Sequence, residues 1–319
     1  MELASPCCSN FPSIISINKT KFSLFSSYHR LSLPPSSSSS FLSSKRCNSA
    51  FKRRAIPSFI QKKTSRSVVC CSQLKVEDDI DNAEACELVN GAELEIGDCN
   101  NTIRASLFQA VKNNNGSGIL LLTDIFGFED SYTRDFAYRV ACNGYNVLVP
   151  DLFRGDPWSK DQSQAQLEQW LAKQDPSRMA TDIATSTKWM VDEFMAADSS
   201  RKLGIIGFCY GGGRVLDVLA RDQDSVFVTG VSFYGTQMNL STASNVKVPV
   251  LFVTGDNDPL CQVHILNELG NVIGNNSKVI VFEGRGHGFV HRPETPEEDA
   301  DAEEAFMIMR NWLQNQLLE

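Results

Sequence analysis

One cysteine stands in a glycine-rich hexapeptide whose spacing suits a catalytic nucleophile. Residues 207–212 are Gly-Phe-Cys-Tyr-Gly-Gly, which places Cys209 two positions from a glycine on either side. An apolar run precedes the hexapeptide and a helix-like segment follows it, as in the strand, sharp turn and helix of a G-x-S-x-G nucleophile elbow. In so tight a turn, a side chain at Gly207 or Gly211 would collide with neighbouring backbone. Because cysteine replaces serine at the centre, the pattern predicts attack by a thiol.

A thiol nucleophile needs a base, and the chain has four histidines: His29, His264, His287 and His291. His287 lies in Gly-Arg-Gly-His-Gly-Phe, directly after the last predicted strand. Open α/β sheets gather their catalytic groups at the carboxyl ends of strands, so we expect His287 to be the base. His264 falls on a predicted helix, and His291 is a candidate for lining the same site.

A histidine base needs an acid that fixes its tautomer. Residues 253–259, Val-Thr-Gly-Asp-Asn-Asp-Pro, end another predicted strand and offer Asp256 and Asp258. At least one of the two is expected to be a turn residue that bonds its own backbone. The order cysteine, aspartate, histidine is that of the α/β-hydrolases.

The elements that must position these side chains follow from the hydrophobic pattern. Apolar runs predict strands over 118–123, 145–149, 202–207, 227–234, 248–254 and 279–282, with one or two edge strands before Val111. Helices are predicted over 132–143, 163–173, 182–195, 213–221 and 263–269. This alternation predicts a mostly parallel, doubly wound α/β sheet flanked by helices.

A last helix is predicted to begin at Pro296, with Thr295 as its cap and Glu298 completing a capping box. The acids of residues 297–304 crowd the end where the helix dipole favours negative charge, so we interpret them as structural rather than as a metal site.

The first 70 residues differ in composition from the rest of the chain. They hold 11 Lys and Arg, 19 serines and a single acid, Glu2. This composition predicts a disordered transit peptide that directs the protein to the chloroplast stroma, with cleavage near residues 69–71. A disordered regulatory tail is the alternative. Residues 71–87 are predicted to be an acidic linker, and residues 88–319 the folded domain.

Residues 71–319 are strongly acidic, with 37 acidic and 19 basic residues. That charge argues against nucleic acid or an anionic membrane surface as a partner. No apolar run approaches the roughly 20 residues that span a bilayer. The cysteines show no zinc-ligand spacing and are expected to be mostly free thiols. We expect a monomer that acts on a small molecule.

Five motifs, taken in order, resemble the dienelactone hydrolase family, or carboxymethylenebutenolidases, of the α/β-hydrolase superfamily. They are Thr-Asp-Ile-Phe-Gly (123–127), Val-Pro-Asp-Leu-Phe (149–153), Gly-Phe-Cys-Tyr-Gly-Gly (207–212), Gly-Asp-Asn-Asp-Pro (255–259) and Gly-Arg-Gly-His-Gly-Phe (284–289). The resemblance covers the chain from about Arg104 to its end. It implies an α/β-hydrolase fold without a large cap domain and, with the leader, a plant chloroplast-type member.

The resemblance also implies a role for each site residue. Cys209 would be the nucleophile, His287 the base and Asp258 the orienting acid, with an oxyanion hole formed by the backbone N–H groups of Tyr210 and Ile125. The implied reaction is the cleavage of a small ester or lactone through a thioacyl-enzyme, with no metal or organic cofactor.

The chain departs from the family pattern at two places. Well-known members have glutamate at the position of Asp124, where it contacts the resting thiol. They also hold an anionic substrate with an arginine after the catalytic histidine, about where His291 stands here, followed by Arg292. Three further arginines are the other basic candidates for the site: Arg154, Arg178 and Arg285.

Two other functions compete with the hydrolase hypothesis. A ligand sensor with slow or no turnover is possible because a fold does not by itself determine function. A glucanase-like activity is the less favoured alternative, because cleavage of a glycosidic bond normally needs a pair of carboxylates.

Overall fold

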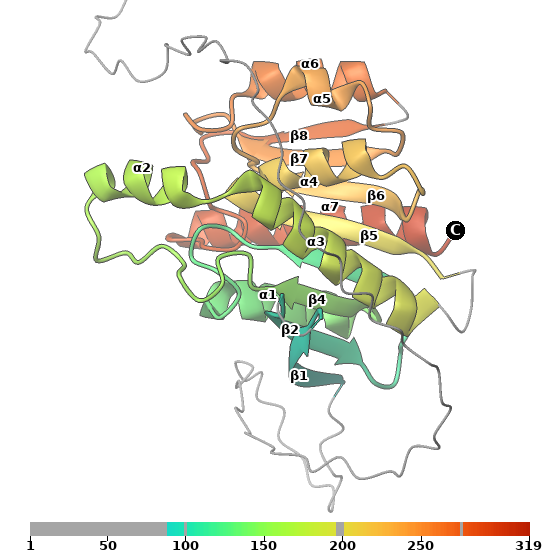
Figure 1. Cartoon of the computed structure of the whole chain (residues 1–319). Coiled ribbons are helices and arrows are strands. Elements are labelled where there is room, and N and C mark those ends of the chain that lie inside the picture. Colours follow the sequence, from blue (N-terminus) through green and yellow to red (C-terminus); the bar gives the residue numbers. More distant parts are fainter. Residues whose placement is uncertain (1–87, 99–100, 196–200, 275–276) are drawn as a thin grey trace, which may run out of the picture. The chain divides into compact units, whose positions relative to one another are not determined.

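A computed structural model describes residues 88–98, 101–195, 201–274 and 277–319 (Figure 1). The predicted transit peptide (1–70) and acidic linker (71–87) lie outside these ranges and stay predictions. The described part contains an eight-stranded sheet with helices on both faces, which confirms the predicted α/β architecture.

The strands lie in the order β1-β2-β4-β3-β5-β6-β7-β8. Strands β3 to β8 are parallel, whereas β1 and β2 are antiparallel to their neighbours. Their bounds are Val89–Ile96 (β1), Ile103–Ala110 (β2), Gly118–Leu122 (β3), Asn146–Pro150 (β4), Leu203–Phe208 (β5), Phe227–Phe233 (β6), Val250–Gly255 (β7) and Lys278–Phe282 (β8). The six predicted strands are thereby confirmed. Every residue of β3, β4, β5 and β7 is buried, as expected for parallel strands covered on both faces.

Helices cover the two faces of the sheet. Their bounds are Ser131–Cys142 (α1), Gln164–Lys173 (α2), Pro176–Met190 (α3), Cys209–Arg221 (α4), Leu240–Ala243 (α5), Val263–Ile273 (α6) and Pro296–Leu317 (α7), and a π-helical turn, Val191–Met195, continues α3. In Figure 1, α1 and α7 lie behind the sheet while α3 and α4 lie in front of it. Between β4 and β5 the described residues form only helices, in agreement with the absence of a large cap domain.

Capping explains two helix starts. Helix α3 begins at Pro176 rather than at the predicted residue 182, because Asp175 accepts a hydrogen bond from the Ser177 N–H (2.9 Å) and proline suits the first turn. Helix α7 begins at Pro296 as predicted, with the Thr295 hydroxyl accepting from the Glu298 N–H (3.1 Å). The capping box is incomplete, since the Glu298 carboxylate accepts from the N–H of Glu294 instead.

Two other helices differ from the sequence predictions. Helix α6 extends four residues beyond the predicted end, to Ile273, and α5 is too short to give a periodic hydrophobic signal.

The turn between β5 and α4 is tighter than the sequence pattern suggested, because α4 begins at Cys209 and not at residue 213. A Cβ on Gly207 would lie 2.8 Å from the nitrogen of Gly212, and a Cβ on Gly211 would lie 2.5 Å from the carbonyl oxygen of Thr123. Real Cβ atoms do not approach so closely, so the predicted collision at both glycines is confirmed. The Gly211 N–H also donates to the Thr123 carbonyl (3.1 Å), which joins the start of α4 to the end of β3.

An aromatic cluster supports this turn from behind. Phe208, the last residue of β5, contacts Phe136 of α1 edge to face (4.7 Å between centroids) and stacks on Phe233 of β6 (5.1 Å). Phe136 in turn contacts Phe306 of α7 (5.3 Å). Such pairs add about 1 kcal/mol each beyond their buried area and fix the backbone that presents Cys209.

We predict that Gly211→Ala lowers the free energy of unfolding by about 3 kcal/mol, because the new Cβ must displace the backbone at the end of β3. The matched control is Gly91→Ala in β1, where a Cβ meets no atom within 4 Å. Urea unfolding of both variants checks the prediction. Equal unfolding midpoints for the two variants would contradict it.

Candidate active site

Cys209 is the first residue of α4, directly after β5, and is partly buried. Its backbone has φ +50°, in the left-handed region that residues other than glycine rarely adopt. Strained backbone of this kind persists where the surrounding structure imposes it, and it concentrates at functional sites. The turn therefore presents the thiol at the carboxyl edge of the sheet and at a helix N-terminus.

Asp258 and His287 meet at the same edge, although 29 positions separate them. The His287 Nδ1 lies 2.7 Å from the Asp258 Oδ2, and the other carboxylate oxygen accepts from the N–H groups of Leu260 (2.8 Å) and Cys261 (3.2 Å). Asp256 instead accepts from the N–H of Gly284 (2.7 Å), which is the turn role expected for one of the two acids. The structure thus brings Asp258 rather than Asp256 to the histidine.

The second ring nitrogen of His287, Nε2, is not engaged by Asp258 and can exchange a proton with another group. Nε2 is buried and has no hydrogen-bond partner within the described ranges. Burial by itself lowers the pKa of His287, but the hydrogen bond that its Nδ1–H donates to Asp258 and the interaction with Cys209 outweigh burial and raise the pKa to about 10. The imidazole therefore lies between a carboxylate on one side and the cysteine on the other.

The two backbone N–H groups expected to form an oxyanion hole belong to Tyr210 and Ile125. Tyr210 is in the first turn of α4, where N–H groups have no intrahelical partner. Ile125 is in the loop after β3, and its carbonyl accepts from the Trp158 N–H (2.8 Å). Among the residues that the structure describes, neither the Tyr210 N–H nor the Ile125 N–H donates a hydrogen bond.

Asp124 makes its hydrogen bonds away from the thiol. Its carboxylate accepts from the Phe126 N–H (2.9 Å), His291 Nε2 (3.0 Å) and Arg292 Nε (2.9 Å). Burial alone would raise the pKa of Asp124, but its bonds to His291 and the charge of Arg292 hold the pKa below its ordinary value. Asp124 is therefore an ionised carboxylate whose described hydrogen bonds do not include Cys209.

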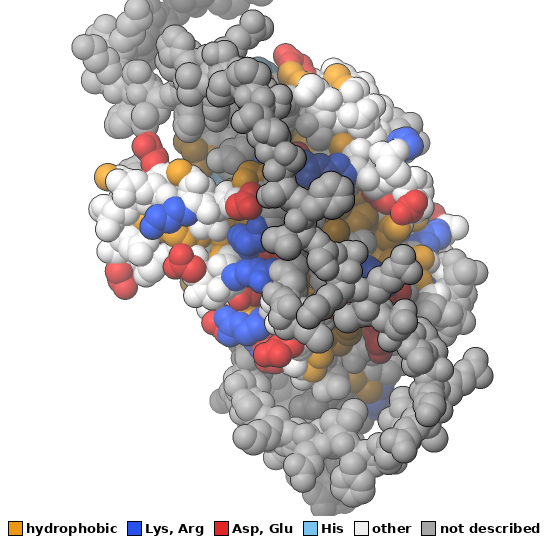
Figure 2. Space-filling model, in the orientation of Figure 1, with side chains coloured by type: hydrophobic (Ala, Val, Ile, Leu, Met, Phe, Trp, Pro, Cys, Tyr) orange, Lys and Arg blue, Asp and Glu red, His pale blue; other side chains and the backbone are white. Residues whose placement is uncertain are grey.

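The arginines that were candidates for holding an anionic substrate are all paired with acids. Arg292 bonds both Asp124 and Asp130 (2.8 Å from Nη2), and Arg285 pairs with Asp301. Arg154 (3.0 Å) and Arg178 (2.8 Å) share the buried Asp182. In Figure 2, basic and acidic side chains are likewise interspersed on the described surface.

Tyr234, directly after β6, is a site residue that the sequence reasoning missed. Its hydroxyl lies 2.5 Å from the His291 Nδ1, and its ring meets the His287 ring edge to face at 5.0 Å between centroids. An aromatic residue at the carboxyl end of a predicted strand was the available signal. His264, in contrast, is exposed on α6.

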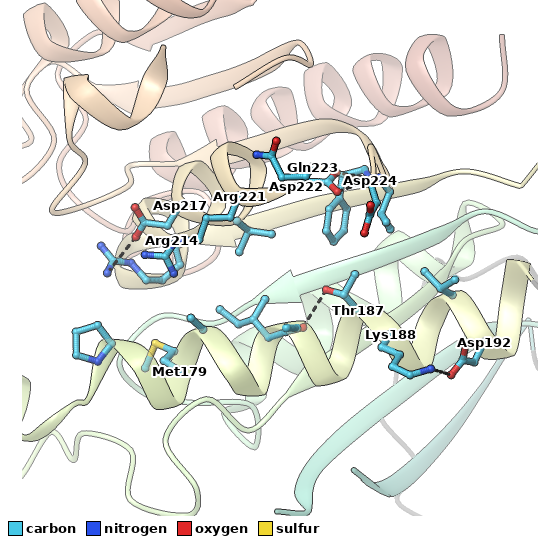
Figure 3. Close-up of a pocket in the computed structure, with 18 residues that line it drawn as sticks. Met179, Thr187, Lys188, Asp192, Arg214, Asp217, Arg221, Asp222, Gln223 and Asp224 are labelled. Atoms are coloured by element: carbon cyan, nitrogen blue, oxygen red, sulfur yellow. Dashed lines mark hydrogen bonds and ion pairs between the residues drawn. The ribbon is translucent and has the colours of Figure 1, made fainter. Parts of the chain in front are cut away.

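A cavity of about 710 Å³ lies elsewhere, between α3 and α4 (Figure 3). Its walls include Met179, Ile183 and Val218, together with the Arg214–Asp217 ion pair. None of the predicted site residues lines it, so the chemistry is assigned to the strand ends and not to this cavity.

Neither a metal cluster nor a membrane span is found in the described ranges. They contain no group of three or more histidine, cysteine or acidic side chains placed to hold a metal ion. Within the same ranges, every helix is too short or too polar to cross a bilayer.

Known proteins are similar to this chain in both sequence and fold. Residues 103–317 match the model of the dienelactone hydrolase family. The carboxymethylenebutenolidase homolog of Rattus norvegicus is 33% identical over 206 residues, which cover 62% of this chain and 82% of the relative. The human carboxymethylenebutenolidase homolog is 29% identical over 243 residues, covering 72% of this chain and 97% of the relative.

A solved structure adds evidence on the fold. The dienelactone hydrolase of Anabaena variabilis superposes with a TM-score of 0.58 at 16% identity, over 72% of this chain and 100% of that one. This likeness confirms the α/β-hydrolase fold. The family match over residues 103–317 shows that the chain belongs to the dienelactone hydrolase family.

Proposed function

We propose that this protein hydrolyses small carboxylic esters or lactones with Cys209 as nucleophile, His287 as base and Asp258 as orienting acid. The observation that carries the proposal is the 2.7 Å hydrogen bond between His287 and Asp258. The other, buried nitrogen of His287 has no hydrogen-bond partner among the described residues, and the imidazole is close enough to Cys209 for the two side chains to interact electrostatically. Membership of the dienelactone hydrolase family supports a hydrolase and does not favour the ligand-sensor hypothesis.

In the first half of the reaction, the Cys209 thiolate attacks the carbonyl carbon and the carbonyl oxygen becomes an oxyanion. The N–H groups of Tyr210 and Ile125 are the donors for this oxyanion, and such donors contribute about 3 kcal/mol each. The tetrahedral intermediate then expels the alkoxide, which takes the proton from the His287 imidazolium. With an ester, the products of this half are a thioacyl-enzyme and a free alcohol. With a lactone, the ring opens and the alcohol stays attached to the acyl group as a hydroxyl.

In the second half, neutral His287 removes a proton from water as the water attacks the thioester. Collapse of the second tetrahedral intermediate breaks the C–S bond and releases the carboxylic acid. The Cys209 thiolate and the His287 imidazolium are thereby restored. Asp258 stabilises the imidazolium in both halves, which is the role that its buried carboxylate and its bond to Nδ1 suit.

We predict that Cys209→Ala and His287→Ala each lower kcat for p-nitrophenyl acetate by at least about 10³-fold, since each removes a group that forms or breaks bonds. His264→Ala, which changes an exposed histidine on α6, is the control and keeps the wild-type rate. Mass spectrometry of the wild type is expected to detect an acyl adduct on Cys209. Wild-type turnover no faster than that of Cys209→Ala would refute the proposed function.

We also predict that Asp258→Asn lowers the pKa of His287 from its value of about 10, because an amide supplies no negative charge to the imidazolium. The imidazolium then loses its proton at a lower pH than in the wild type. An NMR titration measures this, with the His287 signal identified by its loss in His287→Gln. Asp256→Asn is the matched control and leaves the titration unchanged, as its partner is the Gly284 N–H. A titration that shifts equally in both variants would argue against Asp258 as the orienting acid.

We further propose that residues 1–70 direct the protein to the chloroplast stroma, as their serine-rich, basic composition supports. A fusion of these residues to a fluorescent protein is expected to accumulate in chloroplasts and to lose the leader. A fusion that stays in the cytosol would contradict the proposal.

A further inference from the structure

Three buried side chains beside the proposed triad form a hydrogen-bonded chain that the catalytic steps do not use. The Tyr234 hydroxyl lies 2.5 Å from the His291 Nδ1, and the His291 Nε2 lies 3.0 Å from the Asp124 Oδ2. The other oxygen of Asp124 accepts the N–H of Phe126 at 2.9 Å. The chain therefore runs from the end of β6 to the backbone of the loop after β3.

The direction of proton donation along this chain is determined. Burial lowers the pKa of His291 and raises that of Tyr234 well above its ordinary value, so the chain holds a neutral imidazole and a phenol. Asp124 is ionised and only accepts, so His291 Nε2 carries the proton and Nδ1 accepts from the Tyr234 hydroxyl.

The surroundings of His291 hold it in this state. The charged groups that face it are Asp124 from the loop after β3, Arg292 from its own segment and Asp130 from the turn before α1. Phe208 of β5 stacks on its ring, with 4.2 Å between centroids and 22° between planes. The ring is therefore fixed on its faces by packing and on both nitrogens by hydrogen bonds.

Both ends of the chain touch groups that the reaction needs. Ile125, a proposed oxyanion donor, lies between Asp124 and Phe126, which the Asp124 carboxylate ties together. At the other end, the Tyr234 ring packs edge to face on the base, His287 (5.0 Å). Tyr234 has φ +37°, a strained conformation for a bulky residue, and its N–H donates to the Val253 carbonyl (2.7 Å).

We propose that Tyr234, His291 and Asp124 form a positioning relay that holds the Ile125 N–H in place for the developing oxyanion. The inference rests on the proposed function. Tyr234 orients His291, His291 orients the Asp124 carboxylate, and the carboxylate sets the loop. None of the three side chains makes or breaks a bond in the reaction. They act on the stability of the transition state by setting the geometry of the loop that contains Ile125.

The first test is Tyr234→Phe, which removes only the hydroxyl. The acylation rate constant with p-nitrophenyl acetate is expected to fall 10- to 100-fold, the range caused by a misplaced oxyanion donor. KM is expected to stay within about twofold, because an oxyanion donor acts mainly on the transition state.

The second test compares two substitutions of His291. A glutamine amide at this position still reaches Asp124 with an N–H donor, whereas leucine does not. His291→Gln is therefore expected to keep at least five times the rate of His291→Leu, which a role in packing alone does not predict.

Thr229→Val is the control. It removes both hydrogen bonds of a β6 hydroxyl that belong to no proposed site residue: Thr229 Oγ1 accepts from the Trp312 indole N–H (2.8 Å) and donates to the Pro249 carbonyl (3.0 Å). It is expected to lower the urea midpoint without lowering kcat. The relay is overturned if Tyr234→Phe keeps the wild-type rate. It is also overturned if Thr229→Val, when its urea midpoint equals that of Tyr234→Phe, loses as much of the wild-type rate as Tyr234→Phe does. An inactive wild type would refute the proposed function itself, and the relay with it.

Discussion

The close approach of the β5–α4 turn to the end of β3 is the constraint on which the site depends. Neither Gly207 nor Gly211 has room for a Cβ, and the Gly211 N–H bonds the Thr123 carbonyl (3.1 Å). Cys209, in the same turn, has a backbone in the left-handed region (φ +50°). Backbone packing thus presents the proposed nucleophile at the strand ends, before any side chain is considered.

Two histidines at this edge of the sheet, the buried His291 and the half-buried His287, have opposite pKa shifts. His287 bonds Asp258, whose other partners among the described residues are backbone N–H groups, and interacts with Cys209, so the pKa of His287 is raised to about 10. His291 bonds Asp124, whose charge is already balanced by Arg292, and burial lowers its pKa. The same side chain can therefore serve as a proton carrier in one place and as a neutral hydrogen-bond bridge in the other.

The strands were predictable because parallel strands covered on both faces are continuous apolar runs, and the β3 and β5 runs are buried at every residue. The start of α7 was predictable from Thr295 and Pro296 for a similarly local reason, since a cap lies within one turn of the chain. The start of α4 was not. Three consecutive glycines disfavour a helix by local propensity, and their packing against β3 and β6 overrides that preference.

The sequence alone determined the identity of the elbow, the order cysteine, aspartate, histidine and the family, because those signals depend on residue types at short spacing. Its residues left Asp256 and Asp258 equivalent, since both follow the same strand. The family resemblance implied Asp258, and the tertiary structure distinguishes the two acids directly, by turning one carboxylate toward His287 and the other toward a turn N–H. It also decided the partners of Asp124 and revealed Tyr234. Such contacts join strand ends far apart in the chain, and their geometry is set by the packing of the whole sheet.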